Sequence, residues 1–299
     1  MYHTPIMLNE VLCGLDIKPT DICVDATLGG GGHAEQIAMR CKTLIGFDKD
    51  ADAILECKKR LKNFDNIIYI QADFSNAKKE FERLGIKSVD KILLDLGVSS
   101  HQIDTPERGF SFRFDGPLDM RMNKNQNFTA KELVNTFSKE RIGKILWEYG
   151  EEEYAPIIAE NIIKARKKKQ IETTFELKEI VDKSLPAKVR FAGGNKKTFQ
   201  AIRIAVNGEL AHLEKTLKFF AQSLSSGGRI AVLTFHSLEE KQVTNAFMPL
   251  LKNEINNKNL ALQNSVYKYL TNQVITPTPQ EKQNNPRSSC SKLRILQKN

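Results

Sequence analysis

The chain has 299 residues, of which 40% are hydrophobic and 27% are charged, as in ordinary globular proteins. A net charge of +9 and a pI of about 9.2 favour a polyanionic partner, although a lysine-rich surface alone gives the same excess. Five cysteines without C-x-x-C spacing argue against a disulfide framework or structural zinc and fit a reducing cytoplasm, and no apolar run approaches the roughly 18 residues of a membrane span.

Short apolar runs alternate with helical patterns over the first hundred residues. We expect helices over 8–15, 33–40, 51–61 and 77–84, and buried strands over 22–26, 43–48, 67–73 and 91–97. Each strand carries an acid at or near its end. This alternation predicts an α/β fold with a mostly parallel, doubly wound sheet.

The alternation stops after about residue 104. From there to residue 197 we expect no strand, but helices over 130–137, 139–149, 151–168 and 175–183, the last with capping-box spacing between Thr173 and Glu176. We therefore predict a core from 1–104 and 198–299 with an all-helical insertion over 105–197. The basic run 164–169 is interpreted as a solvated helix end, with phosphate contact as the alternative.

The α/β pattern resumes after the insertion. We expect helices over 198–206 and 209–224, a turn over 225–228, a strand over 229–235 and a helix over 238–251. Residues 252–291 are polar and predict weak order except over 265–274. The last apolar run, 292–296, predicts an edge strand that closes the sheet.

Four glycines, Gly29 to Gly32, follow the first strand and open a helix. Glycine lets a backbone approach a ligand closely, and a helix N-terminus presents free N–H groups. Gly29, Gly31 and Ala34 also fit the G-x-G-x-x-A spacing of dinucleotide sites. This pattern indicates a nucleotide-like ligand, and a tight turn without a ligand is the alternative.

Acids lie at four successive strand ends, where open α/β sheets bind their ligands. These acids are Asp25, Asp48, Asp73 and Asp95. Asp48 follows Gly29 by 19 residues, the distance at which an acid binds a ribose diol. Phe74, beside Asp73, is suited to pack on a base.

Four features favour S-adenosylmethionine over a nicotinamide cofactor. The acid series is typical of adenosylmethionine sites, and the segment from Ser225 to Phe235 resembles the fifth strand of class I methyltransferases. No His/Arg pair suited to hydride transfer stands out, and the basic charge suits a polyanionic substrate.

Motifs over nearly the whole chain resemble the MraW family, the small-subunit ribosomal RNA methyltransferases H of bacteria. The motifs are Asp25-Ala-Thr-Leu-Gly-Gly-Gly-Gly-His33, Gly46-Phe-Asp-Lys-Asp50, Leu94-Asp-Leu-Gly-Val-Ser-Ser100, Arg108-Gly-Phe-Ser-Phe112, Asp115-Gly-Pro-Leu-Asp-Met-Arg-Met122, Thr198-Phe-Gln-Ala-Ile-Arg-Ile204, Phe235-His-Ser-Leu-Glu239 and Asn285-Pro-Arg-Ser288. The resemblance implies a class I S-adenosylmethionine-dependent methyltransferase with a Rossmann-like core. It also implies methyl transfer to N4 of a cytidine in the decoding region of 16S ribosomal RNA.

The resemblance also implies the site residues. Donor contacts are expected at Gly31, Gly32, His33, Asp48, Phe74, Asp95 and Gln102. Asp95 is in addition the candidate acceptor for a hydrogen of the target amine, and donor binding alone is the alternative. We expect no metal site, and a structural hydrogen bond for His236.

The helical insertion is expected to help hold the RNA. Its loop carries Arg108, Phe110, Arg113 and Arg121, which are suited to phosphate contact and base stacking, with packing of the insertion on the sheet as the alternative. The expected partner is the 16S ribosomal RNA or the small ribosomal subunit, with no membrane contact and no protein partner evident. Ser289 replaces an arginine common in the family, which weakens a phosphate role for the tail.

Two other functions remain open at this stage. One is a non-catalytic, adenosylmethionine-responsive RNA-binding or ribosome-assembly factor. The other is an NAD-dependent oxidoreductase, which the glycine spacing also allows.

Overall fold

The computed structural model describes residues 5–251, 266–271 and 273–299, and the chain divides into two compact units. We call Met1–Gly97 together with Leu210–Asn299 the core unit, and Val98–Glu209 the helical unit. The helical unit is wider at both ends than the insertion expected over 105–197. Packing explains the later end, because Phe199, Ile202 and Val206 lie in the apolar core of the helical unit.

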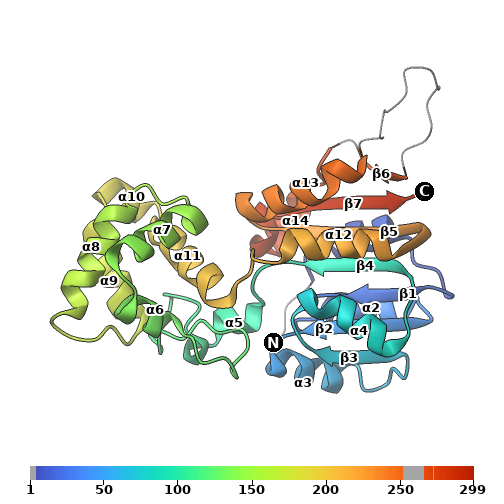
Figure 1. Cartoon of the computed structure of the whole chain (residues 1–299), viewed down its shortest axis with the longest axis horizontal. Helices are drawn as coiled ribbons and strands as arrows, with labels where there is room; N and C mark the ends of the chain where they lie inside the picture. The colour runs from blue at the N-terminus through green and yellow to red at the C-terminus, as the bar shows by residue number, and fades with distance from the viewer. Residues whose placement is uncertain (1–4, 252–265, 272) are drawn as a thin grey trace. The chain divides into compact units, whose positions relative to one another are not determined.

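A seven-stranded sheet runs through the core unit in the order β3-β2-β1-β4-β5-β7-β6 (Figure 1). The first five strands are mutually parallel, whereas β7 is antiparallel to both β5 and β6. The strands are β1 (Ile22–Asp25), β2 (Thr43–Asp48), β3 (Ile67–Gln71), β4 (Val89–Asp95), β5 (Leu224–Thr234), β6 (Tyr267–Tyr269) and β7 (Lys292–Lys298). The strand order reverses between β1 and β4, so their carboxyl ends form the switch point at which such sheets bind ligands.

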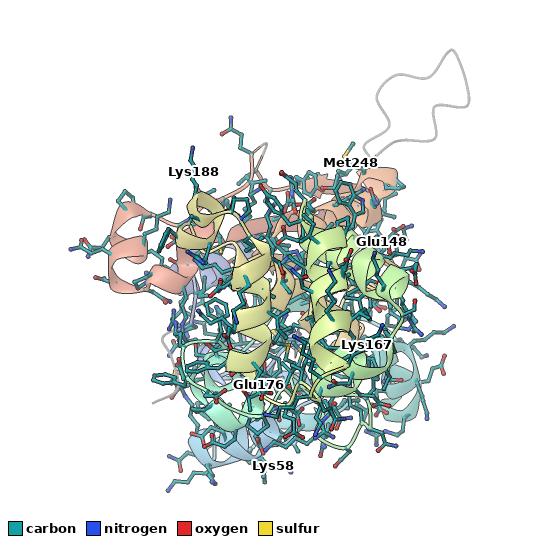
Figure 2. All side chains as sticks on the ribbon, turned by 90° about the vertical axis from the view of Figure 1, so that its left-hand side faces the viewer. Lys58, Glu148, Lys167, Glu176, Lys188 and Met248 are labelled. Carbon is teal, nitrogen blue, oxygen red and sulfur yellow. The ribbon has the colours of Figure 1, made fainter. Side chains whose placement is uncertain are left out.

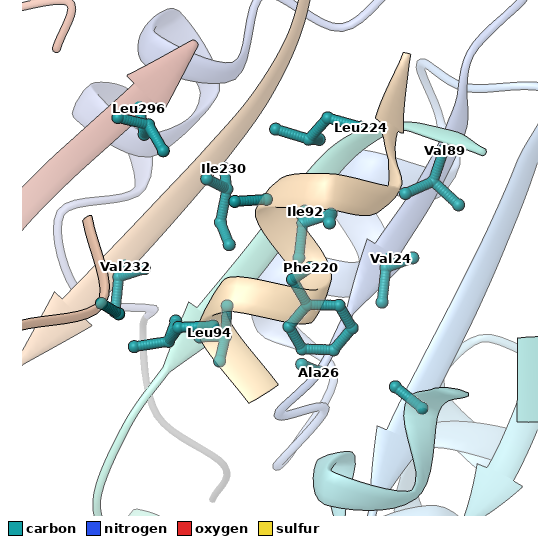
Figure 3. Packing of buried hydrophobic residues seen from close by; sticks show 14 of the residues in the cluster. Val24, Ala26, Val89, Ile92, Leu94, Phe220, Leu224, Ile230, Val232 and Leu296 are labelled. Atoms are coloured by element: carbon teal, nitrogen blue, oxygen red, sulfur yellow. The ribbon is translucent and has the colours of Figure 1, made fainter. Parts of the chain in front are cut away.

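Helices cover both faces of this sheet, because successive strand residues point to opposite faces. Val24, Ile92 and Val232 pack with α4, α12 and α13 (Figure 3), whereas Cys23 and Leu93 pack with α1, α2 and α3. The predicted doubly wound α/β fold is confirmed. The helices of the core unit are α1 (Leu8–Leu15), α2 (Gly32–Ala38), α3 (Ala51–Arg60), η1 (Phe74–Asn76), α4 (Ala77–Leu84), α12 (Leu213–Ser223), α13 (Ser237–Leu251), α14 (Pro279–Asn284) and η3 (Pro286–Cys290).

The helical unit contains, among its described residues, no strand beyond an isolated bridge between Pro117 and Thr173. The predicted capping box of Thr173 and Glu176 is confirmed at the start of α9. The short helices α5 and α10 escaped prediction, because five residues are too few to show a period. The helices are α5 (Ser100–Asp104), η2 (Pro106–Arg108), α6 (Ala130–Thr136), α7 (Lys139–Gly150), α8 (Ala155–Arg166), α9 (Thr174–Ser184), α10 (Ala187–Phe191) and α11 (Asn195–Asn207).

The C-terminal part of the sheet departs from the sequence prediction. The strand expected over 292–296 forms, but it is not the edge, because β6 pairs along its outer side. The turn expected over 225–228 lies within β5, whose register with β4 shifts between Val89 and Lys91. Gly227, with φ of 76°, marks this irregular start of the strand.

The prediction of weak order over 252–291 is wrong for its last part, where α14 and η3 form. Ser288 is fully buried, and its hydroxyl donates to the Asn285 carbonyl at 2.8 Å. Such local bonds satisfy buried polar groups that a hydropathy pattern does not register. Residues 252–265 and 272 lie outside the described residues. Within the described ranges, no helix is both long enough and apolar enough to cross a membrane.

The fold predicts a large stability effect at Phe220, which is fully buried on α12 (Figure 3). Phe220→Ala is expected to lower the free energy of unfolding by about 3–5 kcal/mol, because it removes apolar contact and leaves a cavity. Urea unfolding followed by circular dichroism measures the change. Leu55→Ala is the control, since Leu55 is 58% exposed. Equal unfolding midpoints for the two variants would contradict the packing.

Candidate functional site

A backbone hydrogen bond attaches the turn between β1 and α2 to the sheet. Leu28 N–H donates to the Phe47 carbonyl of β2 at 2.9 Å. Gly29 and Gly31 have φ of 49° and 77°, a region that favours glycine. A Cβ on Gly31 would lie 3.0 Å from the Cys57 sulfur. The turn itself therefore needs two of the four glycines, whatever ligand lies beside it.

Asp48, at the end of β2, ties this turn to the next helix. Its Oδ2 accepts from Gly29 N–H and its Oδ1 from Asp50 N–H, each at 2.8 Å. Burial raises the pKa of Asp48 to about 6. Each carboxylate oxygen has two lone pairs, so Asp48 can still accept a hydrogen bond from a ligand hydroxyl.

Asp25, at the end of β1, is 1% exposed and only partly satisfied by the protein. Its Oδ1 accepts from Thr27 N–H at 3.0 Å, but its buried Oδ2 has no partner among the described residues. Burial, and secondarily the charge of Asp48, raises the pKa of Asp25 to about 7. A buried carboxylate oxygen without a donor points to a ligand that supplies one.

Asp95, at the end of β4, lies beside the same turn. Its backbone N–H donates to Thr27 Oγ1 at 2.6 Å, which joins the ends of β4 and β1. Burial, followed by the charges of Asp25 and Glu239, raises the pKa of Asp95 to about 8. The cluster of acids at the switch point therefore favours protonated carboxyl groups when no cation lies beside it.

His33 faces Asp95 from the start of α2. Its Nε2 lies 3.0 Å from the Ile6 carbonyl, which can only accept, so Nε2 is the donor. Burial lowers the pKa of His33 to about 4, which leaves a neutral ring with a lone pair on Nδ1. Nδ1 is 3.6 Å from Asp95 Oδ2, which is too long for a direct hydrogen bond.

The turn after β5 supplies a fourth acid. Glu239 is 2% exposed, and its Oε2 accepts from Phe235 N–H at 2.7 Å. Its backbone N–H donates to His236 Nδ1 at 3.4 Å, and His236 Nε2 lies 3.1 Å from Glu239 Oε1, at an angle unsuited to a hydrogen bond. His236 thus takes part in the contacts of this turn, in line with the structural role expected for it.

Asp73 and Phe74 follow β3 on the other side of β2. Asp73 Oδ1 accepts from Ser75 N–H at 2.9 Å, and Oδ2 lies 3.2 Å from Lys49 Nζ. Burial alone would raise the pKa of Asp73, but Lys49 and Ser75 outweigh it and hold that pKa below its usual value. Phe74 is half-buried and packs partly on the apolar core, so its ring is held near the strand end.

Gln102 belongs to the helical unit, where it has a structural task. Its side chain accepts from Ser99 N–H at 3.0 Å, and its own N–H donates to Ser99 Oγ at 3.2 Å. This capping box starts α5. The contact with the methyl donor that is expected of Gln102 stays a prediction.

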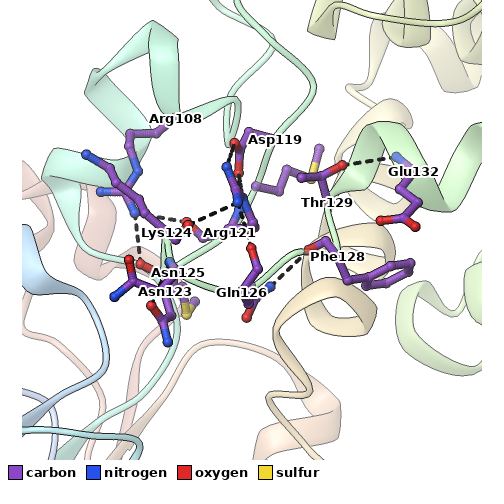
Figure 4. Close-up of polar contacts among 12 residues, drawn as sticks. Arg108, Asp119, Arg121, Asn123, Lys124, Asn125, Gln126, Phe128, Thr129 and Glu132 are labelled. Atoms are coloured by element: carbon purple, nitrogen blue, oxygen red, sulfur yellow. Dashed lines mark hydrogen bonds and ion pairs between the residues drawn. The ribbon is translucent and has the colours of Figure 1, made fainter.

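Two of the four residues expected to contact RNA make hydrogen bonds within their own loop (Figure 4). Arg108 is buried and donates to the carbonyls of Arg121 and Met122 at 2.9 and 3.0 Å. Arg121 donates to both carboxylate oxygens of Asp119, at 2.8 and 2.7 Å, and also to the Gln126 carbonyl. These contacts lie within the loop and are not the packing on the sheet that was the alternative. The RNA contact expected of both arginines stays a prediction.

The other two residues of that set differ from each other. Phe110 packs against the apolar core of the helical unit, with the Arg108 guanidinium 5.8 Å from its ring centre. Arg113 is exposed. Of the four, Arg113 is the one whose charge faces solvent.

Thr27 and Glu239 belong to this site but were not singled out from the sequence. Thr27 lies in the Asp25-Ala-Thr motif, and Glu239 ends the Phe235-His-Ser-Leu-Glu motif. Their signal was their place in these motifs, because neither residue type is unusual at a strand end. The contact between Thr27 and Asp95 joins strands that are distant in sequence, whereas that between Glu239 and Phe235 lies within one turn.

A family model described as the MraW methylase family matches residues 1–299. The chain belongs to the MraW methylase family. It is an S-adenosylmethionine-dependent methyltransferase, and the oxidoreductase and the non-catalytic binding factor are set aside. Its seven-stranded sheet with one reversed strand next to β5 is that of class I methyltransferases.

Curated relatives match the MraW methylase over almost its full length. Ribosomal RNA small subunit methyltransferase H of Clostridioides difficile (strain 630) is 41% identical over 307 aligned residues, covering 99% of each chain. The protein of the same name from Lachnospira eligens is 44% identical over 313 residues, covering 99% of this chain and 97% of the relative.

The residues of the switch point fit S-adenosylmethionine, which supplies an electrophilic methyl group on a positively charged sulfur. Asp25 has a buried oxygen without a partner among the described residues, and burial together with the charges of Asp25 and Glu239 raises the pKa of Asp95. A ligand with an ammonium and a sulfonium group matches both needs. Asp48 lies beside the glycine turn with acceptor capacity for hydroxyl groups.

Asp48→Asn is expected to weaken binding of S-adenosylmethionine by about tenfold or more, because a charge-assisted hydrogen bond is lost. Isothermal titration calorimetry with S-adenosylhomocysteine measures the loss. Asp65→Asn makes the same change at an exposed position of the core unit and serves as the control. Unchanged affinity of the Asp48 variant would remove Asp48 from the donor site.

The raised pKa of Asp95 predicts a pH-dependent stability of the ligand-free protein. The pKa of aspartate in an unfolded chain is about 3.9, whereas that of Asp95 in the fold is about 8. The fold keeps the proton that the unfolded chain releases, so the contribution of Asp95 to stability falls as the pH rises between these values. Asp95→Asn is therefore expected to raise the free energy of unfolding more at pH 8 than at pH 5.

Urea unfolding at both pH values checks this expectation, with Asp65→Asn as the same change at an exposed position of the core unit. The same gain in stability at both values would show that Asp95 ionises normally in the fold.

Proposed function

We propose that this methyltransferase transfers the methyl group of S-adenosylmethionine to N4 of a cytidine in the decoding region of small-subunit ribosomal RNA. The names of the curated relatives support ribosomal RNA as the substrate. The choice of cytidine N4 rests on the motif resemblance and on the chemistry available at Asp95. The observation that carries the proposal is the cluster of acids around the glycine turn at the switch point, in which Asp25 is buried and the pKa values of Asp25 and Asp95 are raised.

The donor is held by the ends of the first three strands in this proposal. Asp48 accepts from the ribose hydroxyls, and Phe74 packs beside the base. Asp25 accepts from the ammonium group through its unpartnered Oδ2. Gly31, Gly32 and His33 form the part of the turn that lies closest to the bound S-adenosylmethionine.

Asp95 acts on the target amine. The exocyclic nitrogen of cytosine is a poor nucleophile because its lone pair is delocalised into the ring, so an acceptor that pulls on its N–H favours a more tetrahedral nitrogen. Asp95 accepts most strongly when it is ionised, and a cation beside it lowers its pKa. The neutral ring of His33 lies beside the carboxyl group, with Nδ1 3.6 Å from Asp95 Oδ2. Alignment of the amine with the methyl group supplies a further part of the rate.

The small ribosomal subunit is the proposed form of the substrate, and the cytoplasm the proposed compartment. A net charge of +9 suits a large polyanion. The helical unit is proposed to hold the RNA, and a base that is paired or stacked has to be extruded before Asp95 can reach its amine.

Asp95→Ala tests the proposal. We expect kcat for methyl transfer to small subunits to fall by about 100-fold, with the donor Kd changed far less, since the lost interaction is made chiefly in the transition state. Labelled methyl transfer and mass spectrometry of the digested nucleosides measure the rate and locate the label, with Asp65→Asn as the control.

A rise in the donor KM at unchanged kcat would limit Asp95 to donor binding. Label on an atom other than cytidine N4 would overturn the proposed target.

A further inference from the structure

A short basic segment of the helical unit stands apart from the residues discussed so far. We call residues 185–197, which include α10 and the start of α11, the α10 surface. It holds four cations, Lys188, Arg190, Lys196 and Lys197, and no acid. All four side chains are exposed.

The cations of the α10 surface differ from most lysines of this unit. No ion pair joins any of the four to another described residue. By contrast, seven lysines elsewhere in the unit lie within ion-pair distance of an acid: Lys131, Lys139, Lys144, Lys164, Lys169, Lys178 and Lys183. Lys197 Nζ donates to the Glu151 carbonyl at 3.0 Å, and its charge acts on Glu152. The positive charge of the α10 surface that has no such compensation is therefore that of Lys188, Arg190 and Lys196.

Phe191 lies among these cations and is 82% exposed. The Arg190 guanidinium lies 5.1 Å from the centre of its ring. A ring and a planar cation on a charged surface form a platform on which a base can stack. The apolar ring is thus surrounded by groups that attract phosphate.

The backbone of the α10 surface is firmly anchored. Leu185 is buried, and Val189 packs on the apolar core from the inner side of α10. Gly194 N–H donates to the Val189 carbonyl at 3.0 Å, and a Cβ on Gly194 would lie 2.7 Å from Val189 Cγ1. Phe191 is therefore held outward by a tightly packed turn.

The basic run at 164–169 differs from the α10 surface in its contacts and in its composition. Lys164 and Lys169 are paired with acids, and Arg166 donates to the carbonyls of Val134 and Phe137. The run contains no aromatic residue. Figure 2 shows that Lys188 and Lys167 lie at different places on the helical unit, so the α10 surface is not an extension of that run.

We propose that the α10 surface binds a single-stranded segment of RNA, with Phe191 stacking on a base and the four cations contacting phosphates. The inference rests on the proposed function, in which ribosomal RNA is the substrate. Single-stranded RNA is the partner that needs both elements, because its bases are free to stack and its backbone carries a charge at every nucleotide. A protein partner with an acidic patch would use the cations but has no such need for an exposed ring.

Phe191→Ala tests the stacking role by fluorescence anisotropy with a short, labelled single-stranded RNA. We expect binding to weaken by about tenfold, within the range known for base–aromatic stacking. Phe191→Tyr keeps the ring and is expected to restore binding. Phe175→Ala removes another exposed ring, 45% exposed at the start of α9, and is expected to change nothing. Because Phe191 is so exposed, its loss leaves the thermal midpoint unchanged.

The salt dependence of binding tests the phosphate contacts. Each neutralised phosphate contributes about 0.7 to the slope of log K against log salt for a single strand. The double variant Lys188→Gln/Arg190→Gln is expected to lower this slope by about 1.4. Lys139→Gln/Lys183→Gln loses the same charge from paired lysines and is expected to keep the slope.

An RNA affinity of the Phe191→Ala variant equal to that of the wild-type protein would overturn the inference. Weaker binding to small subunits with unchanged binding to naked RNA would also overturn it, because it would identify a protein as the partner. Phe191-dependent RNA binding without methyl transfer to cytidine N4 would leave this inference standing and remove the proposed function.

Discussion

The site depends on carboxyl groups buried where the sheet reverses its strand order. Asp25 and Asp95 end neighbouring strands, and Thr27 joins them by accepting the Asp95 N–H and donating its own N–H to Asp25. Asp48 fixes the glycine turn beside them. Burying acids without cations is unfavourable, which is why their pKa values rise. The arrangement is stable in its protonated form and prepared for a ligand that brings positive charge.

The neutral state of His33 follows from the same burial. A charged imidazole would also need solvation, so burial removes its proton and leaves Nδ1 as an acceptor facing Asp95. Acid and histidine together hold one proton, as an ion pair would, but that proton is on the carboxyl group and not on the ring. This pairing allows Asp95 to change charge when a cation arrives, while the ring stays in place through the Ile6 carbonyl.

The helical unit uses its arginines and lysines in two different ways. Arg108 and Arg121 donate to main-chain carbonyls of a loop without regular structure, and Arg166 donates to carbonyls at the C-terminal end of α6. The cations around Phe191 make no ion pair with the described residues and face solvent. The residue type alone therefore does not tell whether an arginine stabilises the protein or is available to bind RNA. That depends on which carbonyl groups and carboxylates its guanidinium can reach.

The sequence by itself determined the α/β alternation, the helical unit, the acids at the strand ends and the family, because these depend on local periodicity and on motifs that are contiguous in the chain. Only the tertiary structure decided which acids lie together, which glycines the turn itself needs, and that Arg108 and Arg121 make hydrogen bonds within their own loop. It also placed β7 inside the sheet and ordered the polar segment at Ser288. These outcomes depend on pairing between distant segments and on burial, and no local pattern encodes either of them.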